Sequence, residues 1–186
     1  MIKTLYEKFQ PWSEKGSVYL ISDTHFEDHD CETMDPNWIS PEEHIKKIKS
    51  KVHKGDTLIH LGDVGNPEWL KQIKSYKVLI MGNHDETVTK FKPYFDEIYQ
   101  GPLFIAEKIL LSHEPFEGLM CCINIHGHDH SGGVHGWYSI NIASNVVGYD
   151  VINLKDIINS GALKRINSIH RETIDRATAK KKRRNI

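Results

Sequence analysis

Five short motifs rich in histidine and carboxylate side chains occur in a fixed order along the chain. Each motif follows a short apolar run, as if several strands delivered side chains to one edge of a fold. Divalent cations bind carboxylate and amide oxygens, and imidazole nitrogens extend the choice to manganese, iron or zinc. The motifs carry enough donors for two metal ions, which is a catalytic arrangement. They are Asp23-Thr24-His25, Gly62-Asp63, Gly82-Asn83-His84-Asp85, Ser112-His113 and Gly127-His128-Asp129-His130.

The spacing inside two of these motifs indicates paired ligands. Side chains two positions apart in a strand point the same way, so Asp23 and His25 are expected to hold one ion. The same spacing separates His128 from His130. The glycines of the second and third motifs let the backbone approach closely at the strand ends.

Each motif alone also has an ordinary structural interpretation. Gly-Asp pairs are common in turns, and Gly82-Asn83-His84-Asp85 could be a tight turn with Asn83 in the left-handed region. All five motifs in order, each after a hydrophobic run, favour a metal centre over a set of unrelated turns.

The first half of the chain alternates strand-like and helix-like segments. Ser40-Pro41-Glu42-Glu43 is a capping box that begins a helix, Gly55 is expected to end it, and Asn66-Pro67 begins a second helix. This alternation predicts right-handed crossovers and a largely parallel sheet, whose carboxyl edge gathers ligands. The predicted strands, residues 18–22, 57–61 and 77–81, end at the first three motifs.

The second half has little helical pattern between its apolar runs, so hairpins are expected there. A last strand at 151–154 and a short helix at 155–160 complete the predicted elements. The strand-like runs lie around Ile98 and at residues 103–106, 109–111, 120–125 and 138–143.

The size and composition fit one domain. The chain has 186 residues, of which 39% are hydrophobic, and we expect the domain to cover residues 1–165. Residues 166–186 are expected to be a helical or loose basic tail. Its residues 180–184 are all Lys or Arg, and without them 19 basic residues face 25 acidic ones. This cluster could contact nucleic acid, and a solvated tail is the alternative.

The cysteines and the hydropathy point to a cytoplasmic protein with no membrane association. Three cysteines without regular spacing form neither a disulfide framework nor a zinc motif. No apolar stretch approaches the roughly 20 residues that span a bilayer, and the first residues lack a secretory signal.

As a set, the motifs resemble the signature of the calcineurin-like metallophosphoesterase superfamily: D-x-H, G-D, G-N-H-[DE], H and G-H-x-H. The resemblance covers residues 18 to about 130 and is closest to small bacterial or phage-type members. It implies an αββα sandwich, in which two mixed β-sheets are flanked by helices. It also implies two divalent metal ions, manganese first, with iron, zinc, cobalt or nickel as alternatives.

The resemblance also implies a role for each motif residue. Asp63 would be shared between the two ions. His84 would not bind metal but face the phosphate, where it would stabilise charge or protonate the leaving oxygen. Asp85 would orient a neighbouring group or be purely structural. The first ion would take Asp23, His25, Asp63 and His130, and the second Asp63, Asn83, His113 and His128.

Other residues beside the motifs have open roles. His60 and His126, which come shortly before the second and fifth motifs, are expected to be structural or to support a ligand. The remaining candidates could reach substrate or line the site, with a solvated loop or an ordinary surface residue as the alternative. They are Asp28, His29, Asp30, His135 and Trp137.

One departure from the superfamily narrows the expected substrate. Phosphoprotein phosphatases continue the second motif as G-D-x-x-D-R-G, whereas this chain reads Gly62-Asp63-Val64-Gly65-Asn66-Pro67. No arginine lies near the motifs, so metals, His84 and backbone must meet the phosphate charge. We expect a phosphodiesterase acting on a nucleotide or nucleic acid. A small-molecule phosphomonoesterase and a metal-binding scaffold without turnover are the alternatives.

Overall fold

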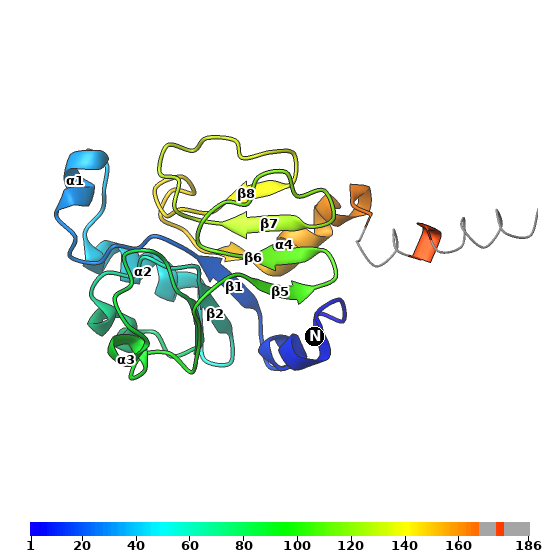
Figure 1. Ribbon diagram of the computed structural model, residues 1–186. Helices are drawn as coiled ribbons and strands as arrows, with labels where there is room; N and C mark the ends of the chain where they lie inside the picture. Colours follow the sequence, from blue (N-terminus) through cyan, green and yellow to red (C-terminus); the bar gives the residue numbers. More distant parts are fainter. Residues whose placement is uncertain (168–173, 177–186) are drawn as a thin grey trace, which may run out of the picture.

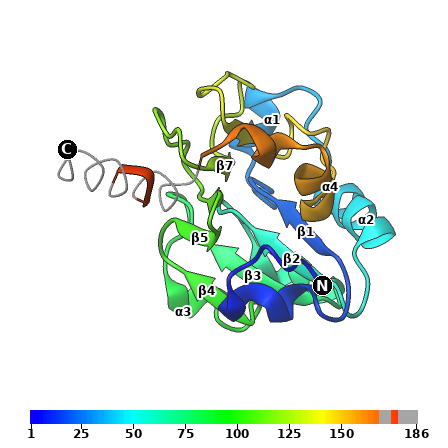
Figure 2. The same cartoon turned by 90° about the vertical axis from the view of Figure 1, so that its right-hand side faces the viewer.

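The structure is a computed structural model that describes residues 1–167 and 174–176 (Figure 1). These residues form two mixed β-sheets with helices on their outer sides, which confirms the expected αββα class. Figure 2 shows the sheets as two separate layers. Most of the expected basic tail, residues 166–186, lies outside the described residues.

The first sheet has the strand order β4-β3-β2-β1-β9. Its four neighbours β1 to β4 are parallel, as the alternation of strands and helices predicts, and β9 joins β1 antiparallel. The strands are β1 (Val18–Ile21), β2 (Thr57–His60), β3 (Tyr76–Ile80), β4 (Glu97–Tyr99) and β9 (Ile152–Asn153).

The second sheet corrects the expectation of hairpins. Only β5 and β6 form an antiparallel pair, whereas β6, β7 and β8 are parallel (Figure 1). Parallel neighbours need a crossover, and here two loops without helix, 112–122 and 127–138, provide it. The strands are β5 (Leu103–Ala106), β6 (Ile109–Leu111), β7 (Ile123–His126) and β8 (Ser139–Asn141), in that order.

The helices are short, and two of them differ from the predicted bounds. α2 begins after Ser40, whose Oγ accepts a hydrogen bond from the Glu43 N–H, but it ends at Lys51, four residues before Gly55. The helix after Asn66 is only a 3₁₀ turn. The helices are η1 (Glu7–Ser13), α1 (Asp30–Met34), α2 (Pro41–Lys51), η2 (Pro67–Gln72), α3 (Val88–Phe91), α4 (Leu154–Asn159) and η3 (Ala162–Arg165).

Two apolar clusters pack against the opposite faces of the first sheet. Because strand side chains alternate, Leu20 and Ile59 face the second sheet while Ile21 and Leu58 face the helices. Ile48 of α2 is fully buried in the second cluster. Burial of each such side chain contributes roughly 1.5–3 kcal/mol.

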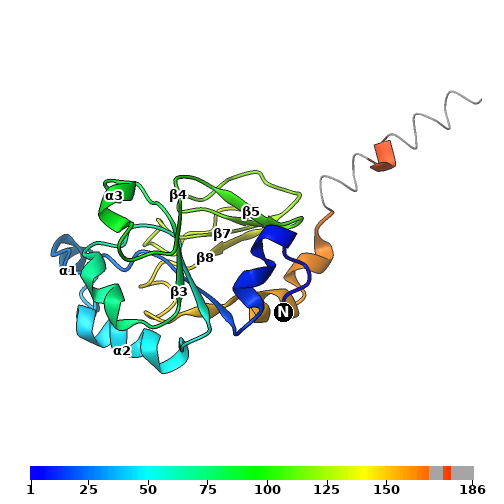
Figure 3. The same ribbon diagram turned by 90° about the horizontal axis from the view of Figure 1, so that it is seen from below.

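Figure 3 shows α1, α2 and α3 together at one end of the molecule, away from η1 and η3.

The two sheets meet beside the ends of β1 and β8. A parallel bridge joins Ser22 to Ala143, and Ser144 donates hydrogen bonds from its N–H and its hydroxyl to the Ser22 carbonyl. These contacts hold together the ends of the two sheets that carry the motifs. Among the described residues, none of the helices has the length and apolar character of a transmembrane span.

Two histidines outside the metal motifs are buried as neutral rings. Thr24 donates its hydroxyl proton to the Val64 carbonyl, so its oxygen accepts from His60 Nε2 at 2.9 Å. His60 Nδ1 and His44 Nε2 have no hydrogen-bond partner. Burial lowers the pKa of His60 to about 3 and that of His44 to about 4, from an ordinary value of 6.5.

These buried rings make the fold sensitive to acid. The unfolded chain takes up protons near pH 6.5, but folded His44 does so only near 4, so stability is full above 6.5 and is lost as the pH falls toward 4. We expect His44→Gln to flatten the pH dependence of the unfolding free energy by up to about 1.4 kcal/mol per pH unit. Urea unfolding of metal-stripped protein from about pH 7 to about pH 4.5 measures this slope.

The matched control is His53→Gln, which removes an exposed histidine next to the same helix. It should follow the wild-type slope. An unchanged slope in His44→Gln would show that His44 takes up its proton equally well in the folded chain.

Candidate metal centre

The five motifs meet at one edge of the molecule, although they come from both sheets. The first candidate ligand of each motif follows the last residue of a strand by two or three positions, and His25 and His130 follow theirs by four. β1, β2 and β3 place their motifs from the first sheet, and β6 and β7 place theirs from the second. Because these five strands end at the same edge, residues distant in the sequence become neighbours.

Among the described residues, three groups could hold a metal ion; two consist of motif residues, and the third is His25 with Asp28 and Cys31. In each group, one donor atom per residue lies within 4.8 Å of the others. The ligating atoms of the two motif groups are imidazole nitrogens and carboxylate oxygens, the mixed set that suits manganese, iron, zinc, cobalt or nickel. The first group is Asp23, His25 and His130, and the second is Asp63, His113 and His128.

The Asp63 carboxylate connects the two groups. Its Oδ2 lies 3.6 Å from His25 Nε2 and 3.2 Å from His113 Nε2. Asn83 extends the second group, because its Oδ1 lies 2.8 Å from His113 Nε2 and 3.1 Å from His128 Nδ1. The structure thus brings together all seven residues expected to hold metal.

The atoms that converge here are mostly acceptors. His113 Nδ1 donates to the Leu61 carbonyl at 2.8 Å, so Nε2 of the neutral ring carries a lone pair. That lone pair faces the acceptor oxygens of Asp63 and Asn83. His25 Nε2 is buried and has no hydrogen-bond partner. A cluster of facing acceptors lacks positive charge, and two divalent cations would supply it.

The pKa values of Asp63 and His113 reflect the same need for positive charge. Burial raises the pKa of Asp63, but hydrogen bonds from His113 and from the His84 N–H outweigh it and lower the pKa to about 2. Burial lowers the pKa of His113, but the Asp63 and Asp23 carboxylates outweigh it and raise the pKa. The two carboxylates therefore favour a proton on His113, and a metal ion bound there would have to displace it.

The backbone at this edge corrects the reason given for the pairing. The residues are not extended: φ is 55° at Asp23, 39° at His25, 56° at Asp63 and 66° at His128. Strand alternation therefore does not aim Asp23 and His25 at the same place; tight turns after the strands do. His128 and His130 fall into different groups. Each left-handed residue costs roughly 1–2 kcal/mol, a strain typical of functional sites.

Glycines make room for the two carboxylates. A Cβ on Gly82 would overlap Asp63 Oδ1, and a Cβ on Gly127 would overlap Asp23 Oδ2 and the Ser22 hydroxyl. Both carboxylates therefore lie directly against the glycine backbone, and a side chain at either glycine would displace them.

Asp85 holds the turn that carries Asp63. Its Oδ2 accepts hydrogen bonds from the N–H groups of Gly82 at 2.8 Å and Asp63 at 3.0 Å, and its Oδ1 accepts from Val64 at 3.0 Å. The side chain is buried, and burial raises its pKa. Asp85 thus ties the second motif to the third.

His84 lies beside the first group with its side chain exposed. Its ring centroid is 5.6 Å from that of His25, and its backbone N–H donates to Asp63 Oδ1 at 2.9 Å. This position leaves the ring nitrogens free to meet a bound ester.

Three orienting contacts were not predicted as such. Asp28 Oδ2 accepts from His25 Nδ1 at 3.1 Å, and Asn145 Oδ1 lies 3.0 Å from His130 Nδ1. The Leu61 carbonyl likewise accepts a hydrogen bond from His113 Nδ1. Each contact sets which ring nitrogen faces the metal position. Asp28 has a sequence signal, three residues after His25; the carbonyl and Asn145 have none.

Trp38 is a further neighbour that the sequence did not single out. Its ring centroid lies 6.1 Å from that of His25 and 5.8 Å from that of His130. Tyr149 contacts the other side of the indole, with centroids 5.4 Å apart. The indole therefore forms an aromatic wall beside the first group.

The remaining candidates lie outside the two groups. His60 binds Thr24, and His126 Nε2 lies 2.6 Å from Ser139 Oγ. His135 Nε2 contacts Asp129 Oδ2 at 2.6 Å. Asp129 itself stands between the candidate ligands His128 and His130 in the sequence. His29 and Asp30 lie at the start of α1, and Trp137 is almost fully exposed.

Comparison with known proteins agrees with this geometry. The chain matches the sequence model of the calcineurin-like phosphoesterases over residues 16–181 and belongs to that family. Family members bind divalent metals and hydrolyse phosphoesters. No curated protein matches the chain.

Two solved structures are similar. A protein of unknown function from Aquifex aeolicus is 27% identical, with a TM-score of 0.65 over 77% of this chain and 98% of its own. The nuclease MPE of Pseudomonas putida is 22% identical, with a TM-score of 0.45 over 61% of each chain.

Gly82 offers a test of the Asp63 position that leaves every candidate ligand in place. We expect Gly82→Ala to weaken manganese binding about 10-fold to 100-fold, because the new methyl group displaces the carboxylate. Calorimetric titration of stripped protein measures it. Gly101→Ala is the control, since its Cβ would meet nothing within 4 Å. Equal affinity in both variants would mean that Asp63 does not hold the ions.

Proposed function

We propose that this phosphoesterase hydrolyses phosphodiesters of nucleotides or nucleic acids, with two divalent cations and manganese as the first choice. The observation that carries the proposal is that the carboxylates of the candidate site have histidine partners and, among the described residues, no lysine or arginine partner. In the part of the chain that the structure describes, no lysine or arginine forms an ion pair with Asp23 or Asp63.

The charge of the substrate follows from that composition. A phosphomonoester carries up to two negative charges near neutral pH, since its second pKa is about 6, whereas a diester carries one. Enzymes that hold dianionic phosphate commonly use arginine for the additional charge. An edge without arginine or lysine favours the monoanionic diester.

The residues have separate tasks in this reaction. Bound divalent cations would supply charge for the phosphate oxygens and lower the pKa of a water molecule. Asp63 spaces the two groups of ligands, and Asp28 and the Leu61 carbonyl orient the imidazoles of His25 and His113. His84 has an exposed ring at the same edge and would donate a proton or hydrogen bond to the leaving oxygen.

The compartment is also a proposal. Cys31, Cys121 and Cys122 are all free, although the last two are adjacent in the sequence. Free cysteines are typical of a reducing compartment, which supports the cytoplasm as the place of action.

Hydrolysis of two nitrophenyl esters tests the activity. We expect manganese to restore cleavage of bis-p-nitrophenyl phosphate by stripped protein, with slower cleavage of p-nitrophenyl phosphate. His84→Ala should lower kcat for the diester about 100-fold or more while both metal ions remain bound. His53→Ala, an exposed histidine elsewhere, is the control and should match the wild type.

The outcomes separate the possibilities. Faster cleavage of the monoester would make the protein a phosphomonoesterase. Full turnover in metal-loaded His84→Ala would remove His84 from the reaction. Binding of two metal ions without turnover of any diester, oligonucleotides included, would overturn the proposed activity.

A further inference from the structure

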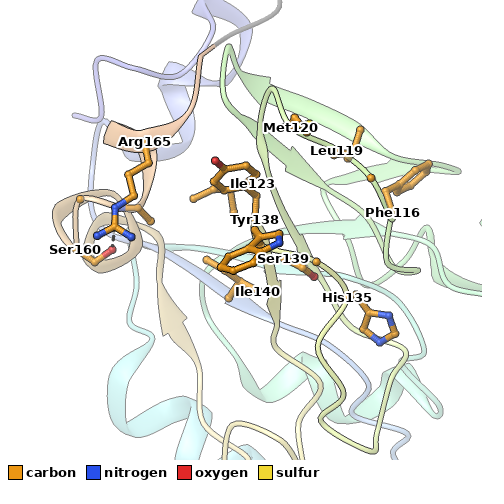
Figure 4. Close-up of a pocket in the computed structure, with 15 residues that line it drawn as sticks. Phe116, Leu119, Met120, Ile123, His135, Tyr138, Ser139, Ile140, Ser160 and Arg165 are labelled. Carbon is orange, nitrogen blue, oxygen red and sulfur yellow. Dashed lines mark hydrogen bonds between the residues drawn. The ribbon is translucent and has the colours of Figure 1, made fainter.

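A large aromatic cavity lies on the second sheet, away from the metal groups. Its volume is about 800 Å³, and it sits at the start of β7 and β8, opposite η3. Figure 4 shows Arg165 and Ser160 on one side and Phe116, Leu119 and Met120 on the other. We call this cavity, lined chiefly by Phe116, Met120, Trp137, Tyr138 and Arg165, the aromatic groove.

The two loops that build the groove begin at the metal edge. Loop 112–122 starts just before His113, and loop 127–138 starts just before His128. Because β6, β7 and β8 are parallel, both loops return from the metal edge to the other end of the sheet. β7 has four residues, which is about 13 Å at 3.3 Å per residue. The groove and the metal edge are therefore opposite ends of one short surface.

Hydrogen bonds link the groove to the metal loop. His135, which lines the groove, contacts Asp129 through Nε2, and Asp129 stands between His128 and His130 in the sequence. Ser139, another lining residue, contacts His126 at the end of β7. A ligand in the groove thus lies against residues that also shape the metal edge.

The groove exposes apolar side chains that a soluble surface normally covers. Trp137 is 97% exposed, Met120 is 76% exposed and Phe116 is 41% exposed. Contiguous exposed apolar surface of this kind marks a binding site. Its volume falls in the range of sites that hold organic ligands.

The chemistry of the lining selects among ligands. Aromatic faces stack on nucleobases of any sequence, and the exposed guanidinium of Arg165 can pair with a phosphate. Hydroxyls of Ser139 and Ser160 add polar contacts. Stacking surfaces beside a cation suit single-stranded nucleic acid, in which a phosphodiester joins each nucleoside to the next.

We propose that the aromatic groove binds a single-stranded oligonucleotide, with bases on Trp137 and Phe116 and a phosphate on Arg165. The inference rests on the proposed phosphodiesterase function, because the strand would run from the groove to the metal edge. The cleaved bond then lies a short distance from the bases that the groove holds, so longer strands are better substrates than dinucleotides.

Fluorescence anisotropy of a labelled oligothymidylate of roughly 12 nucleotides tests binding to the full chain in its metal-stripped form. Trp137→Ala should weaken binding about tenfold, since stacking is lost, and 97% exposure of this side chain makes misfolding no explanation. Phe104→Ala is the matched control, because Phe104 is 46% exposed on the same sheet outside the groove. Arg165→Gln should make the slope of log affinity against log salt concentration shallower by about 0.7, the value expected for the loss of one phosphate contact with a single strand.

Kinetics with manganese keep the two proposals apart. Trp137→Ala should raise KM for the oligonucleotide at least about fivefold more than KM for bis-p-nitrophenyl phosphate. If no diester is cleaved but Trp137→Ala still weakens oligonucleotide binding, the proposed activity fails and the groove stands. If diesters are cleaved and Trp137→Ala binds the oligonucleotide like the wild type, the groove is wrong and the activity stands.

Two further results would overturn the groove as a nucleic-acid site. The first is binding that disappears on removal of residues 180–184 but is unaffected by Trp137→Ala, which would assign it to the basic cluster alone. The second is a dimer in sedimentation that Trp137→Ala dissociates and that the oligonucleotide does not affect, which would make the groove an interface between two copies of the chain.

Discussion

The candidate site depends on one constraint: buried acceptor atoms face one another with too little positive charge between them. The carboxylate of Asp63 lies close to two imidazole nitrogens, and Asn83 turns a carbonyl oxygen to the second of them. Facing lone pairs in a buried place are costly unless a cation or proton lies between them. Two divalent cations would resolve this, and the raised pKa of His113 reflects the same need for positive charge beside Asp63 and Asp23.

The fold brings these acceptor atoms together by packing the backbone and the candidate ligands closely at one edge. Parallel strands from two sheets end at one edge, and the bridge between Ser22 and Ala143 prevents those ends from separating. Left-handed residues such as Asp23 and Asp63 turn the ligands inward, and glycines such as Gly82 let the carboxylates lie directly against the backbone. Hydrophobic burial on both faces of the first sheet offsets the strain that these turns store.

The sequence predicted the parallel first sheet and the residues that the structure gathers at one edge, because capping residues and strand-end motifs are local signals. It did not predict the parallel second sheet, since loops 112–122 and 127–138 cross without a helix. It paired Asp23 with His25 on the assumption of an extended strand, and that reason was wrong. Both residues have left-handed φ values, which residue types alone do not reveal. Contacts such as that of His130 with Asn145 depend on how two loops pack, for which the chain has no local signal.

The most direct test is a crystal structure of the manganese-loaded protein with anomalous scattering. Two peaks roughly 3.5–4 Å apart, each within bonding distance of the Asp63 carboxylate, are the predicted result. One ion should also contact His130 and the other His113. A single ion, or two ions of which neither touches Asp63, would contradict the assignment of this edge as a shared dinuclear centre.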